Sequence, residues 1–340
     1  MTDVLLIFEH ASLNGGERSL LVVLDPLQRD GIRFRAIAPP AGPLVDQLTA
    51  AGVETCALPW RDAPVAGQPR EALRNELAAA IRRLAPDLLH ANSLTTSRLV
   101  GPVAYQLGVP SVGYLRDILR LNAGAVADLN GHTRLLAVSY ATRAYHLAQG
   151  LDAGRTHVLF NGVDVHRFRP RPATGWLHRQ LGLDPASPLM GGVGQIILRK
   201  GWDVWLETAA RVVADQPQAH FVLVGTRHSS KRETCELEQR LRKASCQGPL
   251  RGRVHLLGLR DDVERVLPEL AVLVHPARQE PLGRVLLEAA ASGVPVVATD
   301  VGGVREIFGE GTPAAELVPV DDAKGLAAGV QRILRDREGA

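Results

Sequence analysis

The segment 275–306 contains two carboxylates at a spacing that could bind a sugar joined to a phosphate. It reads HPARQEPLGRVLLEAAASGVPVVATDVGGVRE, with Glu280 and Glu288 eight residues apart. A helix is predicted to start near residues 283–285, where free backbone N–H groups can donate to a phosphate. Glu280 lies before this helix, and Glu288 lies further along it, where it could reach ribose hydroxyls. The glutamate pair alone is better explained by a cap and a solvated side chain. The glycines and the buried strand that follow favour a binding site.

Two glycine-containing loops are further candidates. Gly194 follows a predicted strand, and Arg199 and Lys200 close the same loop, where they could neutralise a diphosphate. The glycine spacing is that of neither a Walker A loop nor a GxGxxG fingerprint, and a basic loop before a helix is more often only surface. Gly16 opens the first predicted helix, where an anion contact and a plain strand-to-helix turn are equally good interpretations.

The elements that position these loops can be predicted from the pattern of the chain. Short apolar runs alternate with amphipathic segments along its length. This pattern is typical of a parallel sheet with crossover helices. The strands it predicts are Val4–Phe8, Phe34–Ala38, Asp87–His90, Ser111–Tyr114, Leu135–Val138, Thr156–Phe160, Leu189–Val193, Phe221–Val224, Val254–Leu257, Val272–His275 and Val294–Thr299. The helices include Glu17–Arg29, Glu71–Leu84, Tyr140–Gln149, Asp203–Asp215, Arg232–Ser245, Gly283–Ala291 and Ala323–Arg335.

Residues 165–187, rich in proline and charge, predict a linker between two domains, 1–164 and 188–340. Each domain is predicted to be a doubly wound α/β sheet, with ligands at the carboxyl ends of its strands and a cleft between the domains. A single barrel of repeated βα units is the competing arrangement, and the polar interruption halfway along the chain disfavours it.

Composition excludes several classes of protein. A net charge of +3 argues against a nucleic-acid binder. The three cysteines lack metal-ligand spacing, so we expect reduced thiols and no zinc. Without a targeting segment or an apolar run long enough to span a membrane, we expect a soluble, cytoplasmic protein. A peripheral contact at the inner face of a membrane stays open. The lone polar residues His10, His90, Asn92 and His275 are interpreted as structural.

Seven motifs then occur in the order of a known family. They are GGE near the N-terminus, PDLLHAN, AVS before a helix, NGVD followed by F-x-P, RKG, LLGLRDDV, and E-x-LG-x-V-x-LEA-x-A-x-GVPVVAT-x-x-GG-x-x-E. In this order the chain resembles retaining glycosyltransferase family 4 (glycosyl transferases group 1) from residue 12 to about residue 310. The last motif is highly specific, and the others add weight through their order.

The resemblance implies a GT-B fold of two Rossmann-like domains that face an interdomain cleft. It implies transfer of a hexosyl group from a nucleotide diphosphate-sugar, with retention, to a glycan, lipid-linked or small-molecule acceptor bound by the N-terminal domain. No metal or other cofactor is implied. The catalytic residues would be Glu280, Lys200, Arg199 and Arg116. The donor-binding residues would be Gly16, Gly283, Arg284, Val285, Glu288 and Arg260.

Three departures accompany the resemblance. Arg116 stands where many members have a sugar-contacting histidine, Gln195 stands where many have arginine, and the chain stops at Ala340, before the crossover helix that usually follows. Two alternatives therefore stay open. One is a GT-B nucleotide-sugar epimerase, and the other is a non-catalytic GT-B protein that binds a nucleotide-sugar or a partner enzyme.

Overall fold

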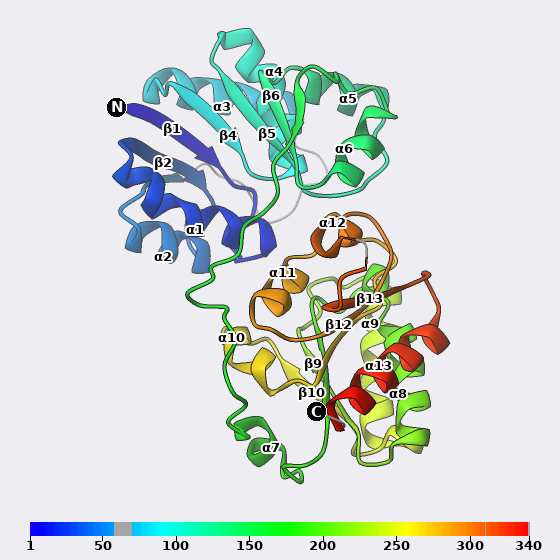
Figure 1. The fold of residues 1–340 in the computed structure, drawn as a ribbon. Coiled ribbons are helices and arrows are strands. Elements are labelled where there is room, and N and C mark those ends of the chain that lie inside the picture. Colours follow the sequence, from blue (N-terminus) through cyan, green and yellow to red (C-terminus); the bar gives the residue numbers. More distant parts are fainter. Residues whose placement is uncertain (58–69, 310, 339–340) are drawn as a thin grey trace. The chain divides into compact units, whose positions relative to one another are not determined.

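The computed structural model describes residues 1–57, 70–309 and 311–338. The chain divides into two compact units, Met1–Gly162 and Val163–Ala340 (Figure 1). The segment 165–187, predicted as a linker, packs within the second unit. It contains helix α7 (Trp176–Leu181), and its Phe168 and Leu177 are buried in that unit's core.

The first unit is built on a parallel sheet with the strand order β3-β2-β1-β4-β5-β6-β7. Its strands are β1 (Thr2–Ile7), β2 (Ile32–Ala38), β3 (Glu54–Ala57), β4 (Leu88–Ala91), β5 (Ser111–Leu115), β6 (Arg134–Ala137) and β7 (Thr156–Val158). The helices between them are α1 (Gly15–Arg29), α2 (Pro43–Ala50), α3 (Arg70–Leu84), α4 (Leu94–Leu107), α5 (Ala123–Asn130) and α6 (Tyr140–Leu147). The strand order reverses between β1 and β4, which is where a doubly wound sheet opens a crevice for ligands.

The alternation of side chains along β1 explains the two helical layers of this unit. Leu5 and Ile7 pack with apolar side chains of α3 and α4, whereas Val4, Leu6 and Phe8 pack with those of α1 and α2. Successive residues of a strand point to opposite faces, so a continuous apolar run buries both faces. Each fully buried leucine or isoleucine contributes about 2 kcal/mol by leaving water.

The second unit repeats this plan with the strand order β10-β9-β8-β11-β12-β13. Its strands are β8 (Leu189–Val193), β9 (His220–Val224), β10 (Val254–Gly258), β11 (Val272–His275), β12 (Val296–Thr299) and β13 (Ala315–Val318). Besides α7, its helices are α8 (Trp202–Asp215), α9 (Arg232–Cys246), α10 (Val263–Val266), α11 (Arg284–Ala291), α12 (Val304–Phe308) and α13 (Ala323–Glu338). Here the order reverses between β8 and β11.

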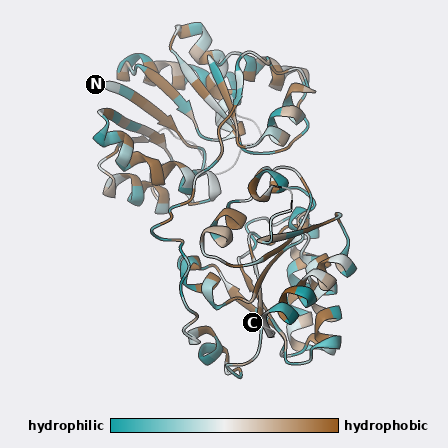
Figure 2. Ribbon diagram, in the orientation of Figure 1, coloured by the Kyte–Doolittle hydropathy of each residue, from teal (hydrophilic) through white to brown (hydrophobic). Residues whose placement is uncertain are grey.

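Both faces of this second sheet are also apolar and covered. Met190, Phe221 and Val274 pack against α8, α9 and α13, while Leu189 and Leu273 face α7, α10, α11 and α12. Figure 2 shows the consequence, because central strands such as β1 and β12 are coloured hydrophobic, while hydrophilic colour lies mainly on the helices. Sheets buried on both sides hold their loops rigidly at the strand ends, which is where the candidate residues lie.

The doubly wound α/β prediction is confirmed in both units. Every predicted strand is present, with ends shifted by at most two residues. The strands β3 and β13 were not predicted, because each is a four-residue edge strand whose residues are mostly only half-buried or exposed. Among the described helices, none is long and apolar enough to span a membrane.

Gly201 fixes how closely two site loops approach in the second unit. It joins a short 3₁₀ turn, Leu198–Lys200, to α8 and has φ +70°. A Cβ placed on it would lie 1.9 Å from the carbonyl oxygen of Pro276. Only glycine allows both the left-handed backbone and this contact, so it lets the loop after β8 rest on the loop after β11.

We expect Gly201→Ala to destabilise the second unit more than Gly252→Ala does. Gly252 has a similar φ of +69° but no atom within 4 Å of an added Cβ, so its substitution carries only the backbone strain of about 1 kcal/mol. The overlap at Gly201 should add about 2 kcal/mol. Urea unfolding followed by the fluorescence of Trp202 and Trp205 measures both variants. Equal losses would show that the contact with Pro276 does not constrain the loops.

Candidate functional site

The candidate residues of the second unit gather where its strand order reverses. Lys200 lies in the loop that follows β8, and Glu280 lies in the loop that follows β11, the neighbouring parallel strand. The carboxyl ends of parallel strands lie along the same side of a sheet, which is called its carboxyl edge here. Lys200 and Glu280, 80 positions apart in the sequence, therefore meet at this edge. The same edge carries the start of α11.

Lys200, Glu280 and His275 form a buried charged cluster at this edge. The Lys200 ammonium pairs with Glu280 Oε2, and His275 Nε2 donates to the same oxygen over 2.9 Å. The side chains are only 13%, 8% and 2% exposed for Lys200, Glu280 and His275. A buried carboxylate needs partners of this kind, because removing its charge from water is costly.

Protonation in the cluster follows from these contacts. Burial alone would raise the pKa of Glu280, but the Lys200 charge and the His275 hydrogen bond outweigh burial and hold that pKa well below its usual range. Burial lowers the pKa of His275 despite the opposing effect of Glu280. At neutral pH Glu280 is therefore a carboxylate, and His275 is a neutral imidazole with its proton on Nε2.

Backbone contacts hold the two loops together around the cluster. Arg278 N donates to Arg199 O over 2.8 Å. The Arg278 guanidinium makes two bonds of 2.9 and 2.8 Å to the Asp203 carboxylate at the start of α8. Gly303 N, from the loop after β12, donates to Glu280 O over 3.1 Å. Three strand-end loops are thus fastened to one another.

The first turn of α11 completes this edge. Gly283 is its N-cap with φ +103°, and no side chain caps the helix there. A Cβ on Gly283 would lie 3.3 Å from Glu280 Cγ, so the helix start touches the cluster. Arg284 and Glu288 bind each other over 3.0 Å, and Val285 is buried in the core. The predicted helix Gly283–Ala291 is confirmed to within one residue, because the helix begins at Arg284.

Arg260, the remaining predicted donor contact, lies after β10 and is held by local partners. Its guanidinium makes two 2.8 Å bonds to Asp262 and lies 5.1 Å from the centre of the Trp176 ring. The side chain is therefore fixed in place. No contact in the described residues joins it to the Lys200–Glu280–His275 cluster, which lies at the ends of β8 and β11.

In the first unit, Arg116 is held at the corresponding edge of the sheet. It directly follows β5, and its guanidinium donates to Asn92 O and Asn92 Oδ1, both over 3.0 Å, and to Asn161 Oδ1 over 2.8 Å. It lies 3.9 Å above the centre of the Tyr114 ring. A Cβ on Gly16 would lie 3.0 Å from Arg116 Cδ, so the glycine lets the first turn of α1 approach the arginine.

From the sequence, Asn92 and His275 are interpreted as structural and Asn161 is given no role. The signal that could have identified Asn92 and His275 is their position directly after, or as the last residue of, a buried parallel strand. Asn161 lies three residues beyond β7 and lacks this signal. Two buried atoms beside Arg116, His90 Nε2 and Asn92 Nδ2, have no hydrogen-bond partner in the described ranges. Burial lowers the pKa of His90 to about 3, with the Arg116 charge acting in the same direction. The ring is therefore neutral.

The structure thus brings Lys200, Glu280 and Gly283 together in one unit, and Gly16 and Arg116 together in the other. Within the described part of the chain, no group of three or more His, Cys, Asp or Glu side chains could hold a metal ion. The charged groups that the structure brings together at the second edge are the Lys200 ammonium and the Glu280 carboxylate, beside the N-terminus of α11.

Comparison with known families agrees with this geometry. Residues 187–336 match the model of the glycosyl transferases group 1, and residues 13–167 match the model of glycosyltransferase family 4. The chain belongs to the group 1 glycosyltransferases. The two matches are separated by residues 168–186, and together they include Arg116, Lys200 and Glu280.

Two relatives of this chain are named as mannosyltransferases. The chain is 30% identical over 239 residues to the lipopolysaccharide core biosynthesis mannosyltransferase LpsB of Rhizobium meliloti, covering 66% of this chain and 65% of LpsB. It is 29% identical over 317 residues to the GDP-mannose-dependent alpha-mannosyltransferase of Mycobacterium tuberculosis, covering 87% of this chain and 78% of the relative. The chain therefore spans just under two thirds of the first relative and more of the second.

A solved structure establishes the fold of the group 1 glycosyltransferase. Anabaena HepE, crystallised with UDP and glucose, matches with a TM-score of 0.84 over 99% of this chain and 91% of HepE, at 22% sequence identity. The fold is therefore GT-B, as the motif order predicted. At this identity the likeness concerns the fold alone.

We expect Lys200→Met to cost about 3 kcal/mol of stability at pH 7, because it leaves the Glu280 charge buried without its cation. Lys200→Met combined with Glu280→Gln should recover more than half of that loss, since it removes the charge as well. Chemical unfolding of the two variants and the wild type tests the coupling. A double variant as unstable as the single one would mean that the pair does not govern the cluster.

Proposed function

We propose that this glycosyltransferase moves a hexosyl group from a nucleotide diphosphate-sugar to a hydroxyl of a glycan, lipid-linked or small-molecule acceptor, with retention and without a metal. One observation carries the proposal. The Lys200–Glu280–His275 cluster adjoins the uncapped start of α11 at the carboxyl ends of β8 and β11. Support comes from relatives named as mannosyltransferases and from HepE structures with UDP and with UDP-glucose.

Lys200 would change partner when the donor binds. In the structure its ammonium pairs with Glu280. A diphosphate carries more charge than a carboxylate and would take over this cation, with Arg199 on the same loop adding a second one. The first N–H groups of α11, at Gly283, Arg284 and Val285, would complete the anion site. These groups do the work that a metal ion does on a diphosphate in other enzymes.

Glu280 would orient the sugar of the donor. Both Lys200 and His275 bind its Oε2, and in the residues described its Oε1 has no hydrogen bond. Oε1 is therefore the atom that would accept from a sugar hydroxyl. His275 keeps the carboxylate ionised and fixed while Lys200 moves to the phosphate. Glu288 would bind ribose hydroxyls from α11, and Arg260 would lie near the nucleotide.

The proposed reaction exchanges one bond at the anomeric carbon for another on the same face. The bond from that carbon to the diphosphate oxygen breaks, and the oxygen takes the bonding pair. The acceptor oxygen forms the new bond, and its proton passes to the departing diphosphate. Lys200 and the α11 N–H groups would stabilise the charge that develops on the leaving oxygen.

The first unit would present the acceptor and face the donor phosphate. Gly16 and Arg116 would contact that phosphate, with Arg116 in the place of a histidine. Asn92 Nδ2, a buried donor beside both residues, would give its hydrogen bond to the same ligand. An unpaired buried donor costs about 1–3 kcal/mol, so a bound oxygen there would relieve that cost.

The activity test uses Lys200→Ala and Glu280→Ala, with Lys243→Ala on the exposed face of α9 as the matched control. We expect each site variant to lose at least about 100-fold in turnover, since each removes a group aimed at the leaving phosphate or the sugar. UDP-, GDP- and ADP-linked glucose and mannose are the donors, and NMR of the product gives its anomeric configuration.

Near-normal turnover in both site variants would contradict the assigned roles, and an inverted product would contradict retention. Donor affinity without hydrolysis or transfer would favour the non-catalytic alternative. Conversion of the nucleotide-sugar without an acceptor would favour the epimerase.

Gly16→Ala should lower turnover by about tenfold while the fold remains stable. The added Cβ would lie 3.0 Å from Arg116 Cδ, so the arginine must shift by a few tenths of an ångström, and small displacements of this kind are costly in a catalytic site. Gly124→Ala, in the first turn of α5 with only Asn122 Oδ1 nearby at 3.6 Å, is the control. Unchanged turnover in Gly16→Ala would remove Arg116 from the site.

A further inference from the structure

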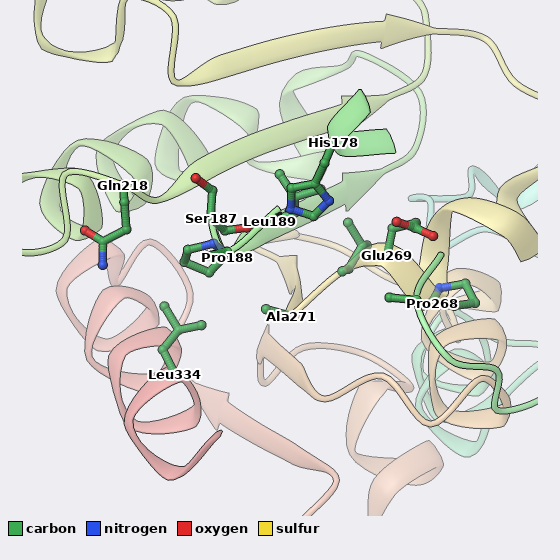
Figure 3. Close-up of a pocket in the computed structure, with 12 residues that line it drawn as sticks. His178, Ser187, Pro188, Leu189, Gln218, Pro268, Glu269, Ala271 and Leu334 are labelled. Atoms are coloured by element: carbon green, nitrogen blue, oxygen red, sulfur yellow. Dashed lines mark hydrogen bonds between the residues drawn. The ribbon is translucent and has the colours of Figure 1, made fainter. Parts of the chain in front are cut away.

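A pocket of the second unit lies at the amino-terminal ends of its strands, at the edge of the sheet opposite to the Lys200–Glu280 cluster. Its volume is about 280 Å³. It is lined by residues that precede β8, β9 and β11, among them Ser187, Gln218 and Ala271 (Figure 3). Each strand rises about 3.3 Å per residue, so a five-residue strand places this edge roughly 15 Å from the other one. The pocket is therefore separate from the proposed donor site.

Two side chains at this pocket are buried with one polar atom unsatisfied. His178 of α7 is 7% exposed and Glu269, just before β11, is 5% exposed. His178 Nδ1 and Glu269 Oε2 have no hydrogen-bond partner anywhere in the described chain. Both residues line the pocket, and Figure 3 shows them reaching it from different elements. Buried polar atoms are normally paired, so two unpaired atoms around one space indicate a ligand.

The remaining contacts of these side chains show how both unsatisfied atoms can act as acceptors. His178 Nε2 lies 2.8 Å from Ser187 O, which can only accept, so Nε2 carries a proton and Nδ1 of the neutral ring presents a lone pair. Glu269 Oε1 accepts from Thr174 N over 2.7 Å and from Thr174 Oγ1 over 2.9 Å. Oε2 is thus the unpaired half of a fixed carboxylate.

The charge at the pocket determines which kind of hydrogen-bond donor fits best. No Lys, Arg or His side chain among the described residues forms an ion pair with Glu269, so its carboxylate is buried without a cation. Such a charge is strongly favoured to pair with a positive group. The remaining walls combine polar side chains, Ser187 and Gln218, with apolar ones, among them Pro188, Pro268 and Leu334, and the apolar part suits a short hydrocarbon.

We propose that this pocket binds a small organic ammonium ion, whose N–H groups donate to Glu269 Oε2 and His178 Nδ1 while its carbon chain lies against the apolar walls. A volume of about 280 Å³ is roughly that of nine water molecules at about 30 Å³ each, which is enough room for a small amine. This site does not depend on the proposed transferase activity.

Calorimetric titration with three molecules of similar shape tests the proposal: n-butylammonium, n-butanol and butyrate. We expect saturable 1:1 binding of n-butylammonium, and affinity at least tenfold weaker for n-butanol and butyrate. Saturating UDP-glucose should leave the n-butylammonium affinity unchanged, since the two edges are separate. Equal binding of n-butanol would overturn the ammonium assignment, and no saturable binding of any probe would show that the pocket holds only water.

Glu269→Gln should weaken n-butylammonium binding at least tenfold, because it removes the charge while keeping an oxygen for Thr174. Glu236→Gln, an exposed carboxylate on α9, is the matched control and should bind as the wild type does. Unchanged affinity in Glu269→Gln would overturn the site. If that variant does not fold, the imidazole NMR signals of His178 in the wild type decide, since they must shift saturably with n-butylammonium and stay unmoved if the pocket is not its site.

Discussion

The burial of Glu280 is the constraint on which the second unit's functional edge depends. A carboxylate removed from water needs a cation and hydrogen-bond donors at fixed positions, and here Lys200 and His275 supply them. Lys200 belongs to one strand-end loop and Glu280 to the next, so the loops cannot separate without exposing an unpaired charge. Gly201 permits the close approach, and the Arg278–Asp203 pair fastens the same two segments. Electrostatics and backbone geometry therefore select one arrangement of the loops.

The first unit holds the charged side chain of Arg116 at the end of β5. Its guanidinium donates to the carbonyl and amide oxygens of Asn92 and to the amide oxygen of Asn161, and it lies over the face of Tyr114. The Arg116 charge also opposes the rise in the pKa of Glu17 that burial causes. These contacts fix the orientation of the guanidinium, as the contacts with Glu280 and His275 fix the cluster of the second unit.

The sequence predicted the sheets well because their signal is local. Buried parallel strands are short apolar runs, and their positions come within two residues of those observed. The motif order added the GT-B fold and directed attention to Lys200 and Glu280. The pairing of these two residues could not be predicted from spacing, because it joins positions 80 residues apart through the reversal of strand order. His275 and Asn92 were interpreted as structural for the same reason, since a lone polar residue shows its partners only after folding.

Among the described residues of the second unit, Glu269 and Glu280 are the buried glutamates, and they lie at opposite edges of one sheet. The difference between them explains why only Glu280 was identified from the sequence. Glu280 lies in a motif whose neighbours include glycines and a helix start, features that bring backbone close to a ligand. Glu269 lies between a proline and a buried leucine, where nothing in the local pattern indicates a ligand. Yet Glu280 is compensated by Lys200 and His275, whereas one oxygen of Glu269 has no partner in the described residues. A buried carboxylate with all its partners, such as Glu280, holds the loops of a site in place, whereas a buried oxygen without a partner, such as Glu269 Oε2, is destabilising until a ligand donates to it. The physical argument for a ligand at Glu269 therefore does not depend on a sequence motif. It applies at the edge of the sheet where no motif was found.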